Sequence, residues 1–308
     1  MAKPRYIPPN STVEITDKCI NDMLLLRPSP ELNDLFLGIL GMALTKFGVL
    51  LHAFVVMSNH LHMLVTTPDA VTLARFMNFV KSKLAREVTR LHHWKDKVFA
   101  GRYKAVIVVD EDAQVERVHY IMSHGVKEDL VWDPEHWPGA TSLPTLIHGD
   151  VLTGTYYDRT AFHRAKRQGN DVTLADFATT CEVPITKLPC WAHLNDQDYQ
   201  ERCRKLLETI REDAKARFRR DCITPMGPRA IRRQSPHSRP KRPKRTPAPL
   251  CHASTPHARK EFRREYRSFV SKYREASARY RAGERDVLFP QHCFPPPRSF
   301  MVPAAVPP

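Results

Sequence analysis

Residues 56–65 read Val-Met-Ser-Asn-His-Leu-His-Met-Leu-Val, a polar turn followed by an apolar strand that opens with two imidazoles. Because side chains alternate faces along a strand, His60 and His62 share one face while Leu61 and Met63 share the other. Two neutral imidazoles on one strand face can bind one metal ion. A turn-capping histidine beside a core histidine is the alternative, and only partners elsewhere in the chain can decide between the two.

Strands and helices alternate on both sides of this hairpin. Asp110 is expected to cap a helix that reaches residue 123, and Gly125 is expected to end it. Gly48 is expected to end an earlier helix at residues 30–47. The order of elements, β-α-β-β-α-β-α, predicts an α+β fold: a ferredoxin-like split βαβ sandwich, an antiparallel sheet with helices on one face. The other face of the sheet would be open to a ligand. Hydrophobic periodicity predicts strands at 12–16, 49–57, 60–66 and 105–109, and helices at 30–47, 70–92 and 110–123.

The third helix supplies candidate partners for the two histidines. Tyr120 and His124 are four residues apart, so they project from one helix face. If this helix docks beside the strand, His60, His62 and His124 could hold a divalent ion with the Tyr120 hydroxyl next to it. A tyrosine, with a pKa near ~10, is a poor nucleophile unless a metal, a cation or a base assists it. A metal that polarises a phosphate would favour its attack. Taken alone, Tyr120 would be a half-buried helix tyrosine, which is much the commoner case, and only its combination with the three histidines favours a catalytic role.

The excess of basic residues lies in one half of the chain. The formal net charge is +15, yet residues 1–150 have 16 Lys and Arg against 17 Asp and Glu, whereas residues 151–308 have 32 against 16. A basic half appended to a neutral one is typical of nucleic-acid binding. A solubilising tail, or an arm that meets acidic proteins or a membrane surface, would have the same charge.

Composition and periodicity predict four segments. Residues 1–148 form a compact domain, and residues 149–224 form a mostly helical extension that includes an amphipathic helix at 196–218. Residues 225–255 form a Pro/Arg/Lys-rich linker or arm, which cannot bury a core. Residues 256–308 contain a basic amphipathic helix and a Pro-rich tail. An aromatic stripe on that helix is expected to pack on the compact domain or on a partner helix rather than on bases: Phe262, Tyr266, Phe269, Tyr273, Ala276 and Tyr280.

The cysteines and the hydropathy pattern favour a reducing cytoplasm. The seven cysteines form no Cys-x-x-Cys pair and are odd in number, which argues against a disulfide framework. No apolar run reaches the ~18 residues that a membrane span needs, and no signal-peptide core follows Met1. A zinc site made from Cys181, Cys190, His193 and Cys203 is a weak alternative, because the spacing fits no common zinc module.

Two blocks of this sequence resemble the REP-associated tyrosine transposases, which belong to the single-tyrosine, His-hydrophobic-His (HUH) transposase superfamily. The first block is residues 54–65, with its His-Leu-His. Each block alone would be weak, but together, over about residues 5–145, they are specific. The second block runs from Gly101-Arg102-Tyr103 through Asp110-Glu111-Asp112, Tyr120-Ile121 and Val126-Lys127-Glu128-Asp129-Leu130-Val131 to Trp137-Pro138.

The resemblance implies a metal-dependent transposase that acts on single-stranded DNA and cleaves and rejoins strands through a 5′-phosphotyrosine on Tyr120. His60 and His62 would be metal ligands, and His124 would be the third, where the family has Asn or Gln. The cofactor would be a divalent ion, Mg²⁺ or Mn²⁺, and a histidine ligand could shift the preference toward Mn²⁺ or Zn²⁺. The partner would be single-stranded DNA with hairpin-forming repeats, with no membrane. Homodimers are common among such relatives, and the location would be the bacterial cytoplasm, at the nucleoid.

Basic side chains outside the triad are expected to hold phosphates. Two other functions remain open. One is a catalytically inactive or domesticated nucleic-acid-binding protein derived from such a transposase. The other is a zinc hydrolase, which would leave Tyr120 and the basic half without a role. The expected phosphate contacts are Arg75, Lys81, Lys83, Arg86, Arg90, Arg102, Lys104, Arg239, Lys241, Arg242, Lys244 and Arg245.

Overall fold

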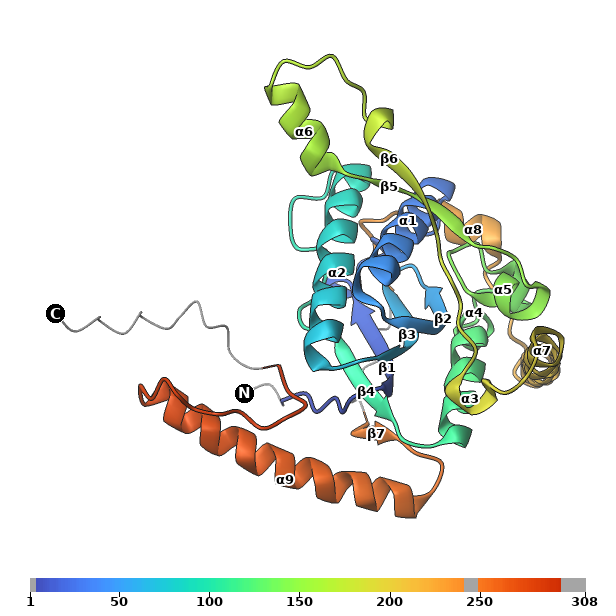
Figure 1. Cartoon of the computed structure of the whole chain (residues 1–308). Coiled ribbons are helices and arrows are strands. Elements are labelled where there is room, and N and C mark those ends of the chain that lie inside the picture. The colour runs from blue at the N-terminus through green and yellow to red at the C-terminus, as the bar shows by residue number, and fades with distance from the viewer. Residues whose placement is uncertain (1–3, 241–248, 295–308) are drawn as a thin grey trace.

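The fold is that of a computed structural model of the chain, in which residues 4–240 and 249–294 are described (Figure 1). All seven elements expected in the first half are present and in the expected order. They are β1 (Ser11–Lys18), α1 (Pro30–Phe47), β2 (Leu50–Val56), β3 (His60–Thr67), α2 (Ala70–His92), β4 (Lys104–Val108) and α3 (Glu111–Met122). Short helices complete this part: η1 (Ile20–Asp22), α4 (His124–Lys127), η2 (Pro134–His136) and α5 (Leu143–His148).

The second half contains more strand than expected. It includes α7 (Asp196–Arg220) and α9 (Pro256–Arg281), the two long helices that the periodicity predicts. Its remaining elements are β5 (Thr153–Tyr157), α6 (Arg159–Arg167), η3 (Ala175–Phe177), β6 (Ala178–Glu182), η4 (Pro189–Trp191), α8 (Pro228–Arg233) and β7 (Cys251–His252).

The main sheet has five strands in the order β2-β3-β1-β4-β7. Its first four strands are antiparallel neighbours, so they form the ferredoxin-like arrangement that the sequence predicts. The register places a candidate metal ligand near a lysine: Thr16 of β1 pairs with His62 of β3 on one side and with Lys104 of β4 on the other. Residues paired across neighbouring strands point to the same face, so these three side chains form one row.

Short-range interactions explain where the helices begin and end. Ser29 and Asp110 accept hydrogen bonds from backbone amides in the first turns of α1 and α3. Gly48 ends α1 with a φ of 63°, as expected. The expectation that Gly125 ends the third helix is wrong, because Gly125 lies inside α4. Its role is close packing: a Cβ at this position would lie 2.9 Å from Cγ2 of Val131.

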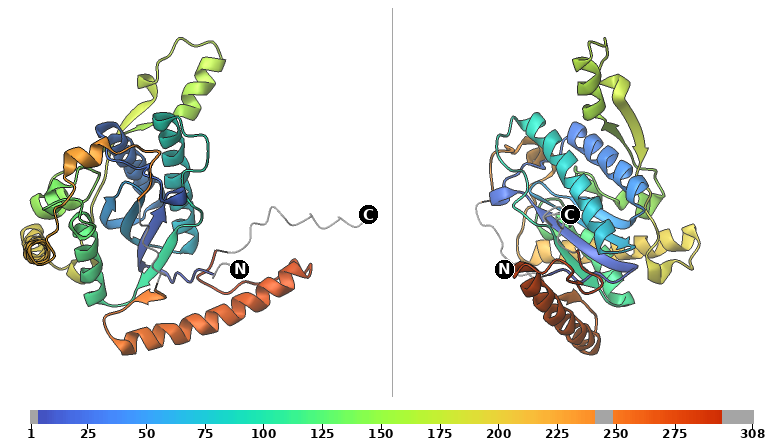
Figure 2. Two further views of the ribbon diagram at one scale, coloured as in Figure 1. Left: turned by 180° about the vertical axis from the view of Figure 1, so that it is seen from behind. Right: turned by 60° about the vertical axis from the view of Figure 1, so that its left-hand side comes forward.

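Helices cover both faces of the sheet, so the expected open face does not exist. On one face α1 and α2 pack over Leu61, Met63 and Val65, which belong to the first hydrophobic core. On the other face α3, α5 and α7 enclose a second core that includes Leu64 and Ile121. Figures 1 and 2 show α2 and α3 on opposite sides of the sheet. The face with His60 and His62 is therefore an internal layer, closed in part by the extension.

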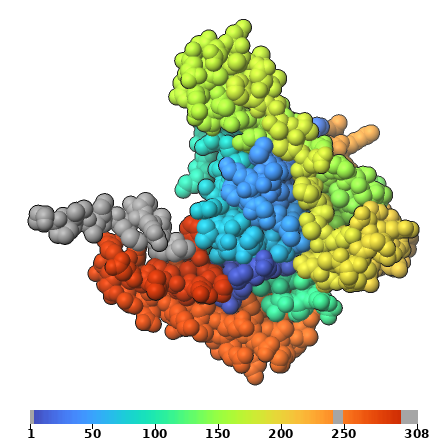
Figure 3. All heavy atoms as spheres, in the orientation of Figure 1, coloured from blue at the N-terminus to red at the C-terminus, as the bar shows by residue number. Residues whose placement is uncertain are grey.

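The hairpin of β5 and β6 lies directly on α1. A Cβ added to Gly38 of α1 would be only 2.1 Å from the carbonyl carbon of Thr155, and one added to Gly154 would be 2.4 Å from the amide nitrogen of Gly38. Two glycines thus allow the backbones of helix and strand to touch. Asp34 of α1 reinforces the contact by accepting hydrogen bonds from the amide and hydroxyl of Thr155. Beyond this contact, α6 projects away from the body (Figures 1 and 3).

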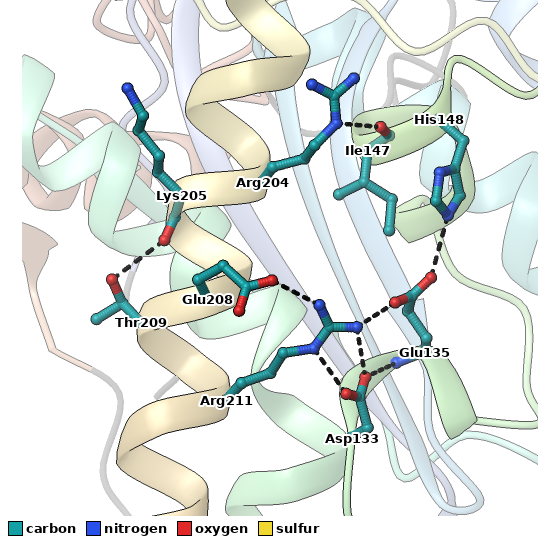
Figure 4. A network of polar contacts seen from close by, with 9 residues as sticks. All are labelled: Asp133, Glu135, Ile147, His148, Arg204, Lys205, Glu208, Thr209 and Arg211. Carbon is teal, nitrogen blue, oxygen red and sulfur yellow. Dashed lines mark hydrogen bonds and ion pairs between the residues drawn. The ribbon is translucent and has the colours of Figure 1, made fainter.

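One arginine fixes α7 to the turn before α5 (Figure 4). Arg211 donates from Nε to Asp133 Oδ2 at 2.6 Å, from Nη1 to Glu208 Oε1 at 2.7 Å, and from Nη2 to Glu135. These carboxylates raise the pKa of Arg211 far above its ordinary value. Such a charge-assisted fork is stronger and more directional than a simple surface ion pair.

The aromatic stripe of α9 packs on the two ends of the described chain, in line with the packing expectation. The ring of Tyr6 lies 4.9 Å from that of Phe269, and the Tyr266 hydroxyl donates to the carbonyl of Pro4 at 3.0 Å. Farther along the helix, the ring of Tyr273 lies 5.4 Å from that of Phe289. Within residues 4–240 and 249–294, every helix is too short or too polar to cross a bilayer.

Candidate metal centre

Three histidines meet between β3 and the start of α4. The ring centroids of His60 and His62 are 5.1 Å apart, and the ring of His124 lies 5.0 Å from the first and 4.6 Å from the second. The Nε2 atoms of His60 and His124 are 2.9 Å apart. Each residue has one ligand nitrogen within 4.8 Å of the others. The structure therefore brings together all three residues expected to be metal ligands.

The remaining ring nitrogens of the β3 histidines have acceptors. His60 Nδ1 lies 2.7 Å from Asn59 Oδ1, and His62 Nδ1 lies 3.0 Å from Glu14 Oε1. Amide and carboxylate oxygens accept, so both Nδ1 atoms carry the proton and both Nε2 atoms present a lone pair. Burial, together with the neighbouring charges of His62 and Lys18, lowers the pKa of His60 well below its ordinary value. A neutral imidazole is the form that binds metal.

The donor set fits a divalent transition ion. Two nitrogens about 2.1 Å from one ion and at right angles to each other are about 3.0 Å apart, and the Nε2 atoms of His60 and His124 are 2.9 Å apart. Imidazole suits transition ions, whereas Mg²⁺ prefers oxygen ligands and keeps several waters. Of the two ions expected from the resemblance, Mn²⁺ fits this set better, and Zn²⁺ fits it as well.

Tyr120 lies against the triad. Its ring centroid is 5.3 Å from that of His62 and 5.1 Å from that of His124. Two cations flank the ring: Nζ of Lys127 is 4.1 Å from its centroid and Cζ of Arg117 is 5.0 Å from it. Arg117 comes one helical turn before Tyr120 and Lys127 comes about two turns after it, and both cations face the Tyr120 ring.

The phenol of Tyr120 has a raised pKa and keeps its proton at neutral pH. Burial and the negative charges of Glu14 and Glu128 raise its pKa to about 12, and the positive charge of Arg117 offsets part of this. Ionisation of Tyr120 therefore depends on an additional positive charge at the site.

Glu14 of β1 is the centre of a buried ion cluster behind the triad. Its Oε1 accepts from His62, while its Oε2 lies 2.6 Å from Nε2 of His252 and 3.6 Å from Nη1 of Arg117. Burial alone would raise the pKa of Glu14, but hydrogen bonds from His252 and His62 lower it far below the ordinary value. Glu14 is therefore ionised and holds its neighbours in place.

Sequence reasoning missed this cluster. The expected strand at 12–16 alternates and Glu14 is its only charged member, but the alternation gives no sign that this polar face is buried. Arg117 lies one turn before Tyr120, so its proximity followed from helical spacing. His252 had no such signal: it lies in a two-residue strand that only pairing with β4 creates.

Three of the expected phosphate contacts on α2 lie far from the triad. Arg75, Arg86 and Arg90 are exposed, but α2 packs on the first core, so the sheet separates them from His60 and His62. Their role as phosphate contacts stays a prediction, and it requires a DNA strand that passes around the sheet edge.

Lys104 is the one expected contact that the sheet register places on the triad face, in the row with Thr16 and His62. Lys81 is bound to Asp17 at 2.9 Å and to the carbonyl of Gly101 at 2.6 Å. The other expected contacts are distributed elsewhere: Lys83 lies over the rings of Phe79 and Tyr156, Arg102 and Arg239 are exposed, and Lys241, Arg242, Lys244 and Arg245 lie outside the described residues.

The alternative zinc site is not formed. Cys181 belongs to the first hydrophobic core and Cys203 to the second, on opposite faces of the sheet. In the described part of the chain, the His60–His62–His124 group is the only set of three or more His, Cys, Asp or Glu side chains close enough to share an ion.

Comparisons with known proteins find similar solved structures and one matching family model. The chain is similar to a solved structure of a REP-associated tyrosine transposase bound to a REP hairpin, with 18% identity and a TM-score of 0.39 over 56% of this chain and 93% of that one. It is also similar to a candidate transposase from Deinococcus radiodurans R1, with 23% identity and a TM-score of 0.29 over 39% of this chain and 95% of that one. No curated protein sequence matches. Residues 29–124, which run from the cap of α1 to the third histidine, match the family model of IS200-like transposases, so this part of the chain is similar to that family.

Proposed function

We propose that this protein is a metal-dependent transposase that cleaves and rejoins single-stranded DNA through a 5′-phosphotyrosine on Tyr120. The observation that carries the proposal is the contact of the Tyr120 ring with two of the three clustered imidazoles. A structural histidine cluster needs no tyrosine, whereas a phosphodiester-cleaving centre needs both a nucleophile and a site for a cation.

In the cleavage step, the Tyr120 oxygen attacks the phosphorus, a new P–O bond forms, and the bond from phosphorus to the 3′-oxygen breaks. Overall, the phenol proton ends on the 3′-oxygen, which leaves as a hydroxyl. The reverse reaction with another 3′-hydroxyl rejoins a strand, because the phosphotyrosine conserves the bond energy. A divalent ion held by His60, His62 and His124 would polarise the phosphate and help to lower the pKa of the phenol.

The chain's own cations favour this reaction. Lys127 and Arg117 lie against the Tyr120 ring and would stabilise its phenolate and the negative charge that develops on the phosphate. Lys104, in the row with His62, is the proposed phosphate contact next to the scissile bond. The expected partner is single-stranded DNA that forms hairpins. A homodimer, and a location in the bacterial cytoplasm at the nucleoid, belong to the same proposal.

The test is formation of a covalent protein–DNA adduct. Wild-type protein, incubated with a labelled single strand and Mn²⁺ or Mg²⁺, is expected to give a denaturation-resistant adduct, and Tyr120→Phe to give none. Tyr157→Phe, which alters a tyrosine of the β5–β6 hairpin, is the matched control and is expected to behave as wild type. An adduct with Tyr120→Phe would overturn the assignment. Tight binding without nicking under several metals would instead identify a non-catalytic DNA-binding protein.

A further inference from the structure

We propose that His252, from the C-terminal extension, is a positioning residue of the metal centre that acts on His62 through Glu14. The inference rests on the proposed function, because it takes His62 to be a metal ligand. It assigns part of the transposase site to a residue far outside the matched segment 29–124.

The contacts form one continuous relay from the extension to the triad. Nε2 of His252 lies 2.6 Å from Oε2 of Glu14, and Oε1 of Glu14 lies 3.0 Å from Nδ1 of His62. Each carboxylate oxygen therefore has its own imidazole. The side chains of Glu14 and His62 are each 6% exposed and that of His252 is 14% exposed, so water competes little for these bonds.

Strand β7 holds His252 at this place by backbone contacts at both ends. His252 pairs with Val108 of β4 in parallel, and its carbonyl accepts from the amide of Val109 at 2.8 Å. Two residues later, the amide of Ser254 donates to Oδ2 of Asp110 at 2.8 Å. Asp110 is also the cap of α3, the helix that bears Tyr120. The extension is thus fastened to the same helix start that orients the proposed nucleophile.

The relay has a defined physical effect. A carboxylate that accepts from Nδ1 of a ligand histidine fixes the ring orientation and makes Nε2 a stronger donor. Without His252, Arg117 at 3.6 Å would be the remaining ion-pair partner of Glu14 Oε2 among residues 4–240 and 249–294. The carboxylate could then turn toward the guanidinium and loosen its bond to His62. Loss of such an outer partner typically weakens metal binding about 10- to 100-fold.

The experiment measures binding of Mn²⁺ alone to the full-length protein, by electron paramagnetic resonance, with Co²⁺ absorption as a report on ligand geometry. His252→Ala is expected to weaken Mn²⁺ binding about 10- to 100-fold and to change the Co²⁺ spectrum. His252→Gln places an amide donor near the position of Nε2 and is expected to stay within about threefold of wild type. His257→Ala, an exposed histidine on α9, is the matched control.

A second pair of variants separates positioning from general destabilisation. His252→Asn keeps a polar group but is too short to reach Glu14, so it should bind as weakly as His252→Ala, even if the alanine variant folds poorly. In a protein that already has Glu14→Gln, adding His252→Ala should cause little further loss of Mn²⁺ affinity, because both substitutions weaken the same bond between Glu14 and His62. Wild-type affinity in both His252→Ala and His252→Asn would overturn the inference and leave the proposed function intact. Failure of wild-type protein to bind Mn²⁺ or Co²⁺ would overturn both.

Discussion

Replacing Gly38 with alanine tests whether the β5–β6 hairpin is an integral part of the fold. The added Cβ would lie 2.1 Å from the carbonyl carbon of Thr155 and 2.2 Å from its oxygen. Carbon atoms in contact are normally about 3.5–4.0 Å apart. The strand therefore has to move outward by more than about 1 Å, because both clashing atoms belong to the backbone and cannot change rotamer.

The expected magnitude is the balance of two opposing effects. In a helix, alanine is favoured over glycine by about 1 kcal/mol. Against this, the hairpin loses the contacts of Tyr156 and Val183, which are 8% and 3% exposed, and each buried apolar side chain contributes about 1.5–3 kcal/mol. The hydrogen bonds from Thr155 to Asp34 are strained as well. We expect a net destabilisation of about 3 kcal/mol, or roughly 6–12 °C in Tm for a chain of this size.

Thermal and urea unfolding, followed by circular dichroism, would measure this effect. Thr45→Ala is the matched control, because Thr45 is exposed on the same helix and an alanine there gains propensity without a clash. If Gly38→Ala were as stable as wild type, or more stable as helix propensity alone predicts, the hairpin would not be tightly docked on α1 and the reasoning would be refuted.

Three further outcomes follow from other contacts. Arg211→Ala should reduce the free energy of unfolding by about 1–2 kcal/mol, because the links to Asp133 and Glu135 are lost, and Arg211→Lys should recover only part of it; equal stability of the three proteins would contradict this. Burial raises the pKa of Asp17 from 3.8 to about 6. Because the folded state therefore binds this proton more tightly than the unfolded state, the free energy of unfolding should fall by up to about 3 kcal/mol as pH rises from 4 to 6. Asp17→Asn should abolish that slope in urea unfolding, and a persistent slope would assign it to other groups. Lys104→Ala should reduce the salt dependence of single-strand binding by about 0.7 in log–log slope, and an unchanged slope would remove Lys104 from the phosphate path.

The part of the fold that local signals encode was predictable. The helix caps at Asp110 and Gly48 and the alternation around His60 and His62 depend on neighbouring residues, and the structure has them in the expected places. The spacing of Tyr120 and His124 was equally readable, since helical periodicity alone places them on one face.

The part that depends on distant pairing was not predictable. Gly125 has the residue type of a helix end, yet its role is to make room for Val131. Likewise, β7 consists of two residues, which are too few to show any periodicity. It forms because β4 would otherwise be an edge strand with unpaired backbone groups. Helix α7, which belongs to the second core, was predictable as an amphipathic helix. Its amphipathic pattern does not say which surface of the protein the helix covers.

The edge position of β7 has a consequence for how the protein is made. Synthesis proceeds from the N-terminus, and domains generally fold as they emerge from the ribosome. Glu14, His62 and Tyr120 emerge first, whereas His252 emerges about 130 residues after Tyr120 and can join β4 only then. If His252 positions the metal centre as proposed, a nascent chain that ends before β7 would contain Tyr120 but a poorly ordered site, so the proposed strand cleavage would wait until β7 has joined the sheet.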